Sequence, residues 1–463
     1  MTDRTRATRL TAAGVTCWVL LGPASSGGPA GAEAAGSTTG RSTVTVSVGE
    51  LETIATEGAG SGLLTAELLS DGRGHVAFVW KTSYRPIRAV RRTAAGGWLR
   101  PVNLGEGSWP DAAMASGGRL VVTWWRNDRR EVVTRRSTAH GWEPTAVLYA
   151  TPRGSNRRAS NPSVAVNPAG DAFVSWWSGT AYDFFDRGAP STAPAPARRS
   201  SKTRRGMRAA VRPHDGDWSA AEWMVLHGGL HGMFVDAAGR PVVLRRSGDA
   251  LSVWTRVGKG AWKGGPGVDL EGSPIAGAVR NPRGDVVVTA SPVAPNTDDD
   301  TSLVQVIRKE ADGGWFPAVT VALAEARWDP DHVVIDGAGR ASILFVTDKL
   351  PALVSSNVQG EWSSPLRFTA HGHRVTALRL ACGPKGALAA VWREAKGQLW
   401  AVYRAGAHAA WSDPVQVSRA ADPGEGVIRP DVTSAGGGAF LVSWISSDGN
   451  TDFFLGRSIG PTD

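Results

Sequence analysis

A glycine at the turn between two short apolar runs recurs eight times along this chain of 463 residues. In five copies a tryptophan follows six positions later, in the pairs Gly74–Trp80, Gly118–Trp124, Gly170–Trp176, Gly386–Trp392 and Gly438–Trp444. The other three pairs are Gly239–Arg245, Gly284–Ala290 and Gly339–Phe345. Each copy predicts two antiparallel β-strands joined by a tight turn, and the repeat requires one such unit every 44 to 69 residues.

A second tryptophan follows each of the first seven glycines and enters a further apolar run. These residues are Trp98, Trp142, Trp218, Trp262, Trp315, Trp362 and Trp411. Between the two landmarks lies one more strand, which commonly ends in arginine, so each unit holds four strands, here called A to D. Strand-only repeats of this length predict an all-β propeller of four-stranded blades. Eight blades are expected, and seven blades with one degenerate unit are the alternative.

The eighth unit ends before any D strand, which leaves its blade incomplete. Residues 42–55, "STVTVSVGELETIA", alternate as a strand would and precede the first A strand. We therefore expect the N-terminal strand to complete the last blade and close the ring, which removes an open sheet edge. The prediction is one propeller domain over residues 42–460.

The turn before each D-strand tryptophan is rich in glycine, as in "AAGGW" and "ADGGW". This turn resembles a degenerate form of the Asp-box of sialidase-like propellers, although the serine of the box is absent and aspartate occurs only as Asp215 and Asp312. The resemblance implies a secreted bacterial propeller of that superfamily. Because the box is an element of the fold there, the resemblance implies nothing about activity.

The first 34 residues have the composition of a signal peptide. Arg4, Arg6 and Arg9 precede an apolar run from Leu10 to Leu21, and small residues follow. That run is shorter than the roughly 20 residues of a membrane-spanning helix. The prediction is a signal peptide over residues 1–34 and a secreted or extracellular protein, with a retained anchor as the alternative.

The positive charge of the chain is concentrated in blade 3. The net charge is +9, and residues 187–214 hold eight basic residues and no acidic one. Residues 186–206 are predicted to be a disordered basic loop between strands B and C. With the neighbouring loops they suggest a basic sector on one face that binds an anionic or carbohydrate polymer of the cell envelope. The candidate binding residues are Arg126, Arg129, Arg130, Arg153, Arg157, Arg158, Arg198, Arg199, Lys202, Arg204 and Arg205.

The twenty tryptophans divide into two predicted groups. Those of strand B should be buried between blades, as for Trp80, Trp176, Trp392 and Trp444. Four tryptophans near loops are expected to be exposed, and these are Trp109, Trp125, Trp177 and Trp328.

A binding propeller is the favoured function, and an extracellular hydrolase or lyase of polysaccharide is the alternative. No metal ion or cofactor is expected, because the histidine pairs His227/His231 and His371/His373 lack further ligands at suitable spacing. Nucleic acid is not an expected partner, since the basic segment lacks interleaved aromatic residues. The protein is expected to be a monomer.

Overall fold

A computed structural model describes most of the propeller region. The described residues are 45–58, 63–83, 85–152, 157–180, 206–224, 229–247, 250–270, 275–290, 301–311, 313–325, 332–368, 374–419, 422–423, 425–448 and 451–461. The predicted signal peptide lies outside them, and so does the predicted basic loop except for Gly206, at which β14 begins.

The first four blades follow one another along the chain. Blade 1 consists of β3 (Leu63–Ser70), β4 (Val76–Thr82), β5 (Ile87–Arg92) and β6 (Val102–Gly105). Blade 2 consists of β7 (Ser108–Ala115), β8 (Arg119–Arg126), β9 (Glu131–Thr138), β10 (Gly141–Trp142) and β11 (Ala146–Ala150). Blade 3 consists of β12 (Arg157–Val166), β13 (Ala172–Thr180), β14 (Gly206–Arg212) and β15 (Glu222–Trp223). Blade 4 consists of β16 (Gly229–Val235), β17 (Pro241–Ser247), β18 (Ala250–Gly258) and β19 (Ala261–Asp269).

The remaining blades repeat this order. Blade 5 consists of β20 (Ile275–Arg280), β21 (Val286–Ala290), β22 (Thr301–Lys309) and β23 (Val319–Glu325). Blade 6 consists of β24 (Val333–Ile335), β25 (Ala341–Thr347), β26 (Leu350–Ser355) and β27 (Leu366–Arg367). Blade 7 consists of β28 (Val375–Cys382), β29 (Leu388–Glu394), β30 (Leu399–Arg404) and β31 (Val415–Gln416). Blade 8 consists of β32 (Glu425–Gly436), β33 (Ala439–Ser447), β34 (Thr451–Pro461), β1 (Val46–Val48) and β2 (Glu52–Gly58).

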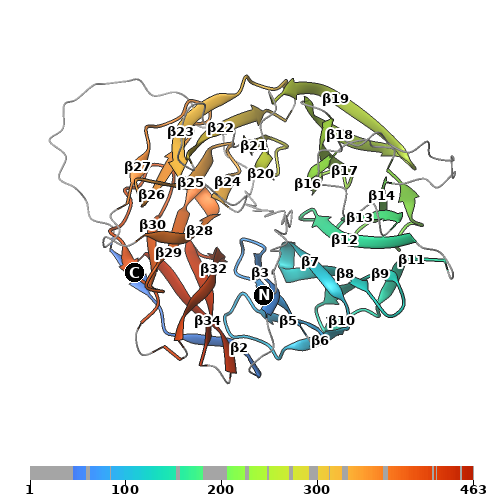
Figure 1. Cartoon of the computed structure of the whole chain (residues 1–463), viewed down its shortest axis with the longest axis horizontal. Helices are drawn as coiled ribbons and strands as arrows, with labels where there is room; N and C mark the ends of the chain where they lie inside the picture. Colours follow the sequence, from blue (N-terminus) through green and yellow to red (C-terminus); the bar gives the residue numbers. More distant parts are fainter. Residues whose placement is uncertain are drawn as a thin grey trace, which may run out of the picture.

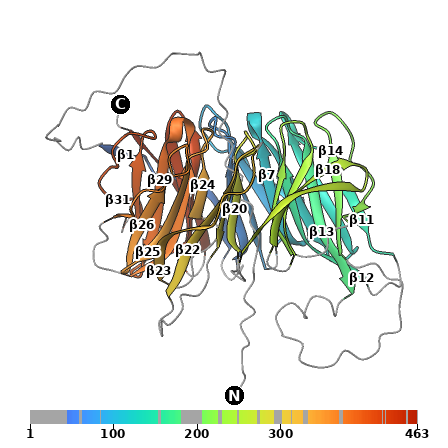
Figure 2. The ribbon, with the colours of Figure 1, turned by 90° about the horizontal axis from the view of Figure 1, so that it is seen from above.

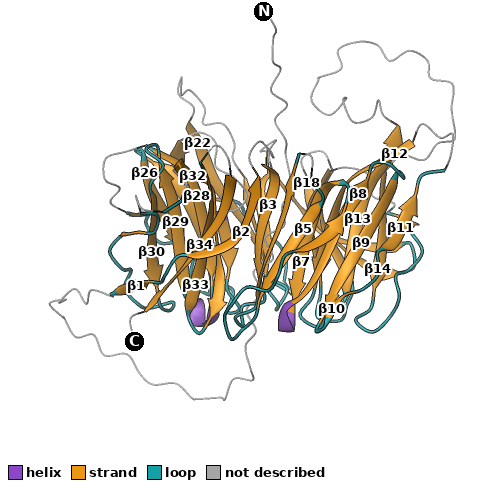
Figure 3. Cartoon of the chain, turned by 90° about the horizontal axis from the view of Figure 1, so that it is seen from below, coloured by secondary structure: helices purple, strands orange, loops and turns teal. Residues whose placement is uncertain are grey.

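The eight antiparallel sheets form a ring, with the first strand of each blade nearest the centre (Figure 1). The predicted eight-bladed propeller is confirmed, and the alternative of seven blades is wrong. Two short 3-10 helices, η1 (Ser116–Gly118) and η4 (Pro384–Gly386), form the A-to-B turns of blades 2 and 7. Both lie on the same face of the ring, which we call the turn face (Figure 3). The opposite face carries the B-to-C and D-to-A connections, and we call it the loop face (Figure 2).

The N-terminal segment closes the ring, as predicted. Both β1 and β2 pair antiparallel with β34, so the last blade contains strands from both ends of the chain. The alternating run is two strands rather than one, because the chain passes through Gly49 to Leu51 between them. The backbone N–H of Gly49 nevertheless donates to the carbonyl of Ser458, so contact with β34 continues between the two strands.

Two glutamates of β2 fasten blade 8 to blade 1. Glu57 is buried and accepts hydrogen bonds from the indole N–H of Trp80 at 3.0 Å and from Arg88 at 2.8 Å. Glu52 accepts from the indole N–H of Trp98 at 2.7 Å and forms an ion pair with Arg92. The closing strand therefore joins its neighbour through charge-assisted hydrogen bonds as well as through apolar packing.

The strand-B tryptophans are the largest fully buried side chains of the core between blades. Trp80, Trp124, Trp176, Trp392 and Trp444 are each at most 2% exposed, which confirms the predicted burial. Neighbouring blades pack face to face, so a side chain on either face of strand B meets an adjacent sheet. In these five blades and in blade 6, where Phe345 stands, the repeat position holds a large apolar side chain that fills the space between blades.

The A-to-B turns require glycine because of the backbone conformation that they impose. In blade 3 the side-chain oxygen of Asn167 accepts from the N–H groups of Gly170 and Asp171, both at 2.9 Å. Gly170 has a φ of +99°, a region that residues with a Cβ rarely adopt. The amide nitrogen of Asn167 donates to the carbonyl of Asp236 in blade 4 at 2.9 Å. The side chain of Asn167 thus stabilises the turn and also connects it to the next blade.

Removing the closing strands should destabilise the whole ring. A chain that begins at residue 59 lacks β1 and β2, and so exposes the edge of β34 and leaves Arg88 and Arg92 without their glutamates. We expect a lower Tm and concentration-dependent aggregation, measured by thermal unfolding and light scattering. The matched control is a chain that begins at residue 45 and keeps both strands. Equal Tm values for the two chains would contradict the closure.

Truncation of Trp176 should cost stability because its side chain is fully buried. We expect Trp176→Ala to lower the free energy of unfolding by about 3–5 kcal/mol in urea titrations. Trp109→Ala is the control, since Trp109 is 36% exposed, and it should change that free energy little. A Trp176→Ala protein as stable as the control would show that the repeat position is not a packing position.

Candidate functional site

The predicted basic residues of blade 2 lie at the hairpin between β8 and β9, on the loop face, where Arg126 ends β8 and Arg129 and Arg130 belong to the turn. Arg126 forms an ion pair with Glu131, the residue directly opposite it in the strand register. Arg129 is well exposed and forms an ion pair with Asp128 at 3.6 Å. Arg130 closes the turn with a φ of +56°. Arg126 and Arg129 therefore have acidic partners, which reduces the positive charge that this hairpin presents.

Two of the predicted basic residues of blade 3 lie at the start of its innermost strand. Arg157 and Arg158 begin β12 and pair with Thr180 and Gly179 at the end of β13. The remaining predicted residues of this blade lie outside the described residues, and they are Arg153, Arg198, Arg199, Lys202, Arg204 and Arg205.

The four tryptophans that were expected to be exposed differ in their surroundings. Trp109 is exposed and Trp177 is half-buried. The expectation for Trp125 is wrong, because it is 5% exposed and packs in the core between blades 2 and 3 with Val132, Leu148 and other apolar residues. Trp328 lies outside the described residues.

Two further arginines of the basic stretch, Arg208 and Arg212, belong to the junction between blades 2 and 3. The guanidinium of Arg208 lies 4.2 Å from the ring centroid of Trp223 and 4.7 Å from that of Tyr149. Arg212 forms an ion pair with Glu143 at 2.6 Å. Both arginines therefore stabilise the junction through cation–π and ionic contacts.

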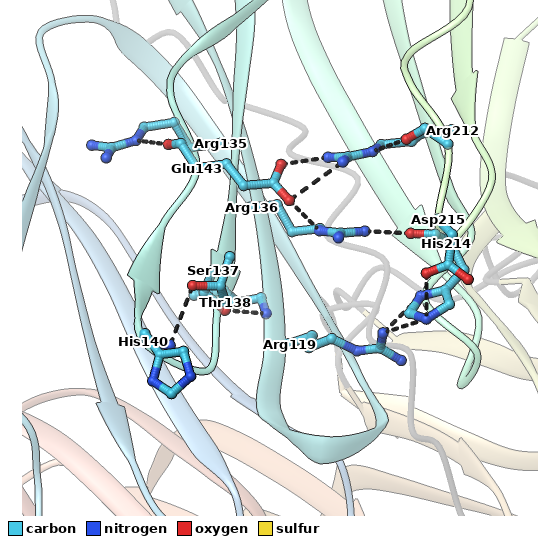
Figure 4. Close-up of polar contacts among 12 residues, drawn as sticks. Arg119, Arg135, Arg136, Ser137, Thr138, His140, Glu143, Arg212, His214 and Asp215 are labelled. Carbon is cyan, nitrogen blue, oxygen red and sulfur yellow. Dashed lines mark hydrogen bonds and ion pairs between the residues drawn. The ribbon is translucent and has the colours of Figure 1, made fainter.

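Glu143 is the centre of a polar cluster on the turn-face side of this junction (Figure 4). Its carboxylate binds Arg212 of blade 3 and also Arg136 of its own blade, the latter at 2.9 Å. Burial alone would raise the pKa of Glu143, but the two arginines outweigh burial and hold that pKa below its ordinary value. The guanidinium of Arg136 also donates to the carbonyl of His214 at 2.7 Å, which extends the cluster into blade 3.

Arg119 continues this cluster beside the A-to-B turn of blade 3. It donates to Nδ1 of His214 at 2.6 Å (Figure 4). It also donates to the carbonyl of Ala169 at 2.7 Å. Burial and the nearby Arg136 lower the pKa of Arg119 from its ordinary value, while Asp215 and Asp171 oppose that change. The cluster contains acids and bases in similar number, so it serves as a junction rather than as a strongly cationic surface.

A ring of equivalent positions that the sequence did not single out lies at the innermost strands. It occupies the position seven residues before each repeat glycine, namely Glu67, Asp111, Ser163, Gly232, Gly277, His332, Arg379 and Asp431. Three of these side chains reach the inner strand of the next blade. Asp111 accepts from the N–H of Val164 at 2.7 Å, and Asp431 accepts from that of Leu68 at 3.2 Å. His332 donates through Nε2 to the carbonyl of Leu378 at 2.9 Å.

Desolvation perturbs the titration of these inner residues. Burial raises the pKa of Asp111 to about 7, against the opposing hydrogen bonds from the backbone of Val164 and Ala112. Burial also raises the pKa of Asp431, and Arg379 opposes that shift. Burial and the charge of Arg379 lower the pKa of His332 to about 3, so this histidine is neutral. Aligning the eight repeats would have identified these positions in advance.

Two cavities lie between blades on the side of the turn face. One of about 370 Å³ lies between blades 6 and 7 and is bordered by Arg340, Trp362 and Arg404. The other, of about 240 Å³, lies between blades 1 and 2 and is bordered by Arg91 and Trp142. The guanidiniums of Arg91 and Arg135 lie 5.9 and 5.8 Å from the ring centroid of Trp142. The larger cavity has the volume of a small-molecule site.

The described part of the chain offers neither a cluster of metal ligands nor a membrane-spanning helix. No three or more histidine, cysteine, aspartate or glutamate side chains are grouped so that they could hold a metal ion within the part of the chain that the structure covers. No helix in that same part is both long enough and apolar enough to cross a bilayer.

Comparisons with known proteins assign this chain to no family. No family model matches the chain, and no curated protein matches it either. Among solved structures it is similar to puromycin hydrolase, with 16% identity and a TM-score of 0.46, over 84% of this chain and 59% of that one. It is also similar to virginiamycin B lyase from Staphylococcus aureus, with 9% identity and a TM-score of 0.37, over 88% and 99% of the two chains. A third is the fucose-specific lectin from Aleuria aurantia, with 11% identity and a TM-score of 0.34, over 78% and 100%.

These similarities assign no activity or ligand to the chain. The chain spans less than two thirds of the length of puromycin hydrolase. The three proteins also differ from one another in what they act on or bind. The function has to be inferred from the residues of this propeller.

Glu143→Gln should weaken the junction between blades 2 and 3, because it removes the charge that Arg136 and Arg212 share. We expect a loss of about 1–2 kcal/mol in the free energy of unfolding near neutral pH. The folded-state pKa of Glu143 is lowered, so its contribution is present above the ordinary value of 4.5 and is lost as the pH falls through the lowered pKa. Urea unfolding of both proteins over that range should show the difference disappear in acid. Glu310→Gln, an exposed surface change, is the control.

Proposed function

We propose that this chain is a secreted propeller that binds an anionic polymer of the cell envelope through basic residues of blades 2 and 3. The observation that supports this most directly is the strand register of blade 3. Arg157 and Arg158 begin β12 beside the end of β13, and β14 begins opposite that end at the pair Gly206 and Ser178. The connection 181–205, which contains most of the predicted basic loop, therefore leaves β13 and enters β14 at the end of the sheet where Arg157 and Arg158 lie.

The basic residues of the connection between β13 and β14 come close to a described strand in the sequence. Arg204 and Arg205 directly precede Gly206, the first residue of β14. The turn between β8 and β9 in blade 2 adds Arg129 and Arg130 on the same face. Long connections on a rigid scaffold commonly carry the function of a fold.

The charge distribution favours an anionic partner. Residues 187–205 hold six basic residues and no acidic one. Arg208 and Arg212 are engaged inside the blade junction, so the charge available for a partner belongs to the connection itself. Such a segment attracts polyanions through long-range electrostatics that dissolved salt screens.

The position of the D-strand tryptophans supports our proposal that the chain is related to the sialidase-like propellers. Trp98, Trp315, Trp362 and Trp411 each form a single β-bridge with the last residues of strand C, directly after a turn. This is the position that the Asp-box resemblance implies. It concerns the fold, and the binding proposal does not depend on it.

Replacing the five residues Arg198, Arg199, Lys202, Arg204 and Arg205 with glutamine should abolish retention on an anionic polysaccharide column. The wild-type chain should be retained and should elute with rising salt, because screening weakens the attraction. Elution salt concentration is the measurement, and an unchanged Tm shows that the fold is intact.

The control variant loses the same number of positive charges, but from surface residues outside blades 2 and 3. Five exposed basic residues of the described surface are replaced with glutamine, namely Arg100, Lys259, Lys263, Lys385 and Lys396. This variant should be retained as strongly as the wild type. Equal loss of retention by both variants would contradict a localised basic sector, and so would retention of the first variant at the wild-type level.

A further inference from the structure

Four arginines occupy the same position of the repeat, at the turn-face end of strand C. Each lies opposite the D-strand tryptophan of its own blade, in the pairs Arg92–Trp98, Arg212–Trp218, Arg256–Trp262 and Arg404–Trp411. At this position the guanidinium faces the junction with the preceding blade. What it meets there differs between the blades.

Three of the four arginines bind a glutamate of the preceding blade. Arg92 of blade 1 pairs with Glu52 of blade 8 at 3.1 Å. Arg212 of blade 3 pairs with Glu143 of blade 2 at 2.6 Å, and Arg256 of blade 4 pairs with Glu222 of blade 3, also at 2.6 Å. In each case the glutamate comes from the outermost part of the preceding sheet. An arginine at this position is therefore built to hold a carboxylate across the junction.

Arg404 of blade 7 has no such partner among the described residues. In blade 2 the glutamate follows the D-strand tryptophan directly, as Glu143 follows Trp142, and in blade 6 the residue that follows Trp362 is Ser363. The N–H of Ser363 bonds to strand C as the N–H of Glu143 does, so the two residues are structurally equivalent. The Nε of Arg404 is buried without a hydrogen-bond partner, and its guanidinium lies 5.1 Å from the ring centroid of Trp411.

The cavity of about 370 Å³ lies where the glutamate is missing. Both Ser363 and Arg404 line it, together with Trp362. The nearby Arg340 is already engaged, since its Nε binds the carboxylate of Asp336 at 2.7 Å. A buried polar group without a partner is costly, and Arg404 therefore favours an occupant that brings a negative charge.

Hydroxyl groups and an aromatic ring complete the lining. Ser356 and Ser363 each accept a backbone N–H, from Ala341 at 2.9 Å and from Ser355 at 3.1 Å, and each keeps its own hydrogen to donate. Glu361 also lines the cavity, and its carboxylate accepts a hydrogen bond from the side-chain amide of Asn357 at 2.7 Å. The carboxylate can accept a further hydrogen bond from a hydroxyl group of an occupant. The volume is at the lower end of the range for small-molecule sites.

We propose that the cavity between blades 6 and 7 binds a small carboxylate about the size of one sugar ring, with the carboxylate on Arg404 in the place of the missing glutamate. The hydroxyl groups of an acidic sugar would meet the serines and Glu361, and its apolar face would meet Trp362. This site is separate from the basic residues of blades 2 and 3. Its test is therefore independent of the proposed polymer binding.

Calorimetric titration of the full chain with glucuronate and with glucose tests the proposal. The two sugars differ only in the carboxylate, so glucuronate should bind and glucose should bind at least tenfold more weakly. Arg404→Gln should lose glucuronate affinity by about tenfold or more. Arg367→Gln, the same change at an exposed arginine of blade 6 outside the cavity, should keep it.

A second variant makes the test independent of any loss of fold. Ser363→Glu restores the glutamate that blade 2 has at this position, so it should pair with Arg404, raise the Tm and abolish glucuronate binding. Three results would overturn the proposal. They are equal affinity of the wild type for the two sugars, wild-type affinity in Arg404→Gln, and wild-type affinity in a folded Ser363→Glu protein.

Discussion

The pairing of β2 with β34 is the contact on which the rest of this propeller depends. Each blade buries its faces only against two neighbours, so an open ring would leave two sheets half-exposed. The N-terminal strands complete the last sheet and then present Glu52 and Glu57 to blade 1. Because these carboxylates bind both arginines and tryptophan indoles, closure fixes the angle between the first and last blades.

The junctions between blades repeat a small set of polar contacts around a constant apolar core. The strand-B tryptophans fill the core, while the A-to-B turns and the strand-C arginines connect each sheet to the next. Asn167 and Asn281 make the same bond, each to the carbonyl of the corresponding aspartate in the following blade. On the inner strands, Asp111 and Asp431 also make corresponding bonds, at the cost of a raised pKa. The apolar positions define the fold, and the polar positions distinguish one junction from another.

The sequence predicts the fold well because glycine marks the A-to-B turn in every blade, and tryptophan marks strand B or strand D in most of them. The same reasoning fails for Trp125. Successive residues of a strand point to opposite faces, and both faces of this strand are buried, so Trp125 is buried as Trp124 is. It also fails for the inner ring. The residue seven positions before the repeat glycine differs in type between blades, from glutamate at Glu67 to glycine at Gly277, so no single blade reveals the position. The predicted basic residues of the loops follow from charge only, and charge does not specify where a side chain points.

The cavity between blades 6 and 7 was beyond prediction for a different physical reason. Its defining feature is a serine in one blade and an arginine in the next, 41 positions apart in the numbering from Ser363 to Arg404. Neither residue is unusual until the register shows that the corresponding pair elsewhere is glutamate and arginine. A pocket can thus form in a repeat protein where one junction has a smaller side chain than the equivalent junction elsewhere, because the neighbouring blades keep the scaffold rigid. The arginine that remains then determines the charge of whatever fills the space.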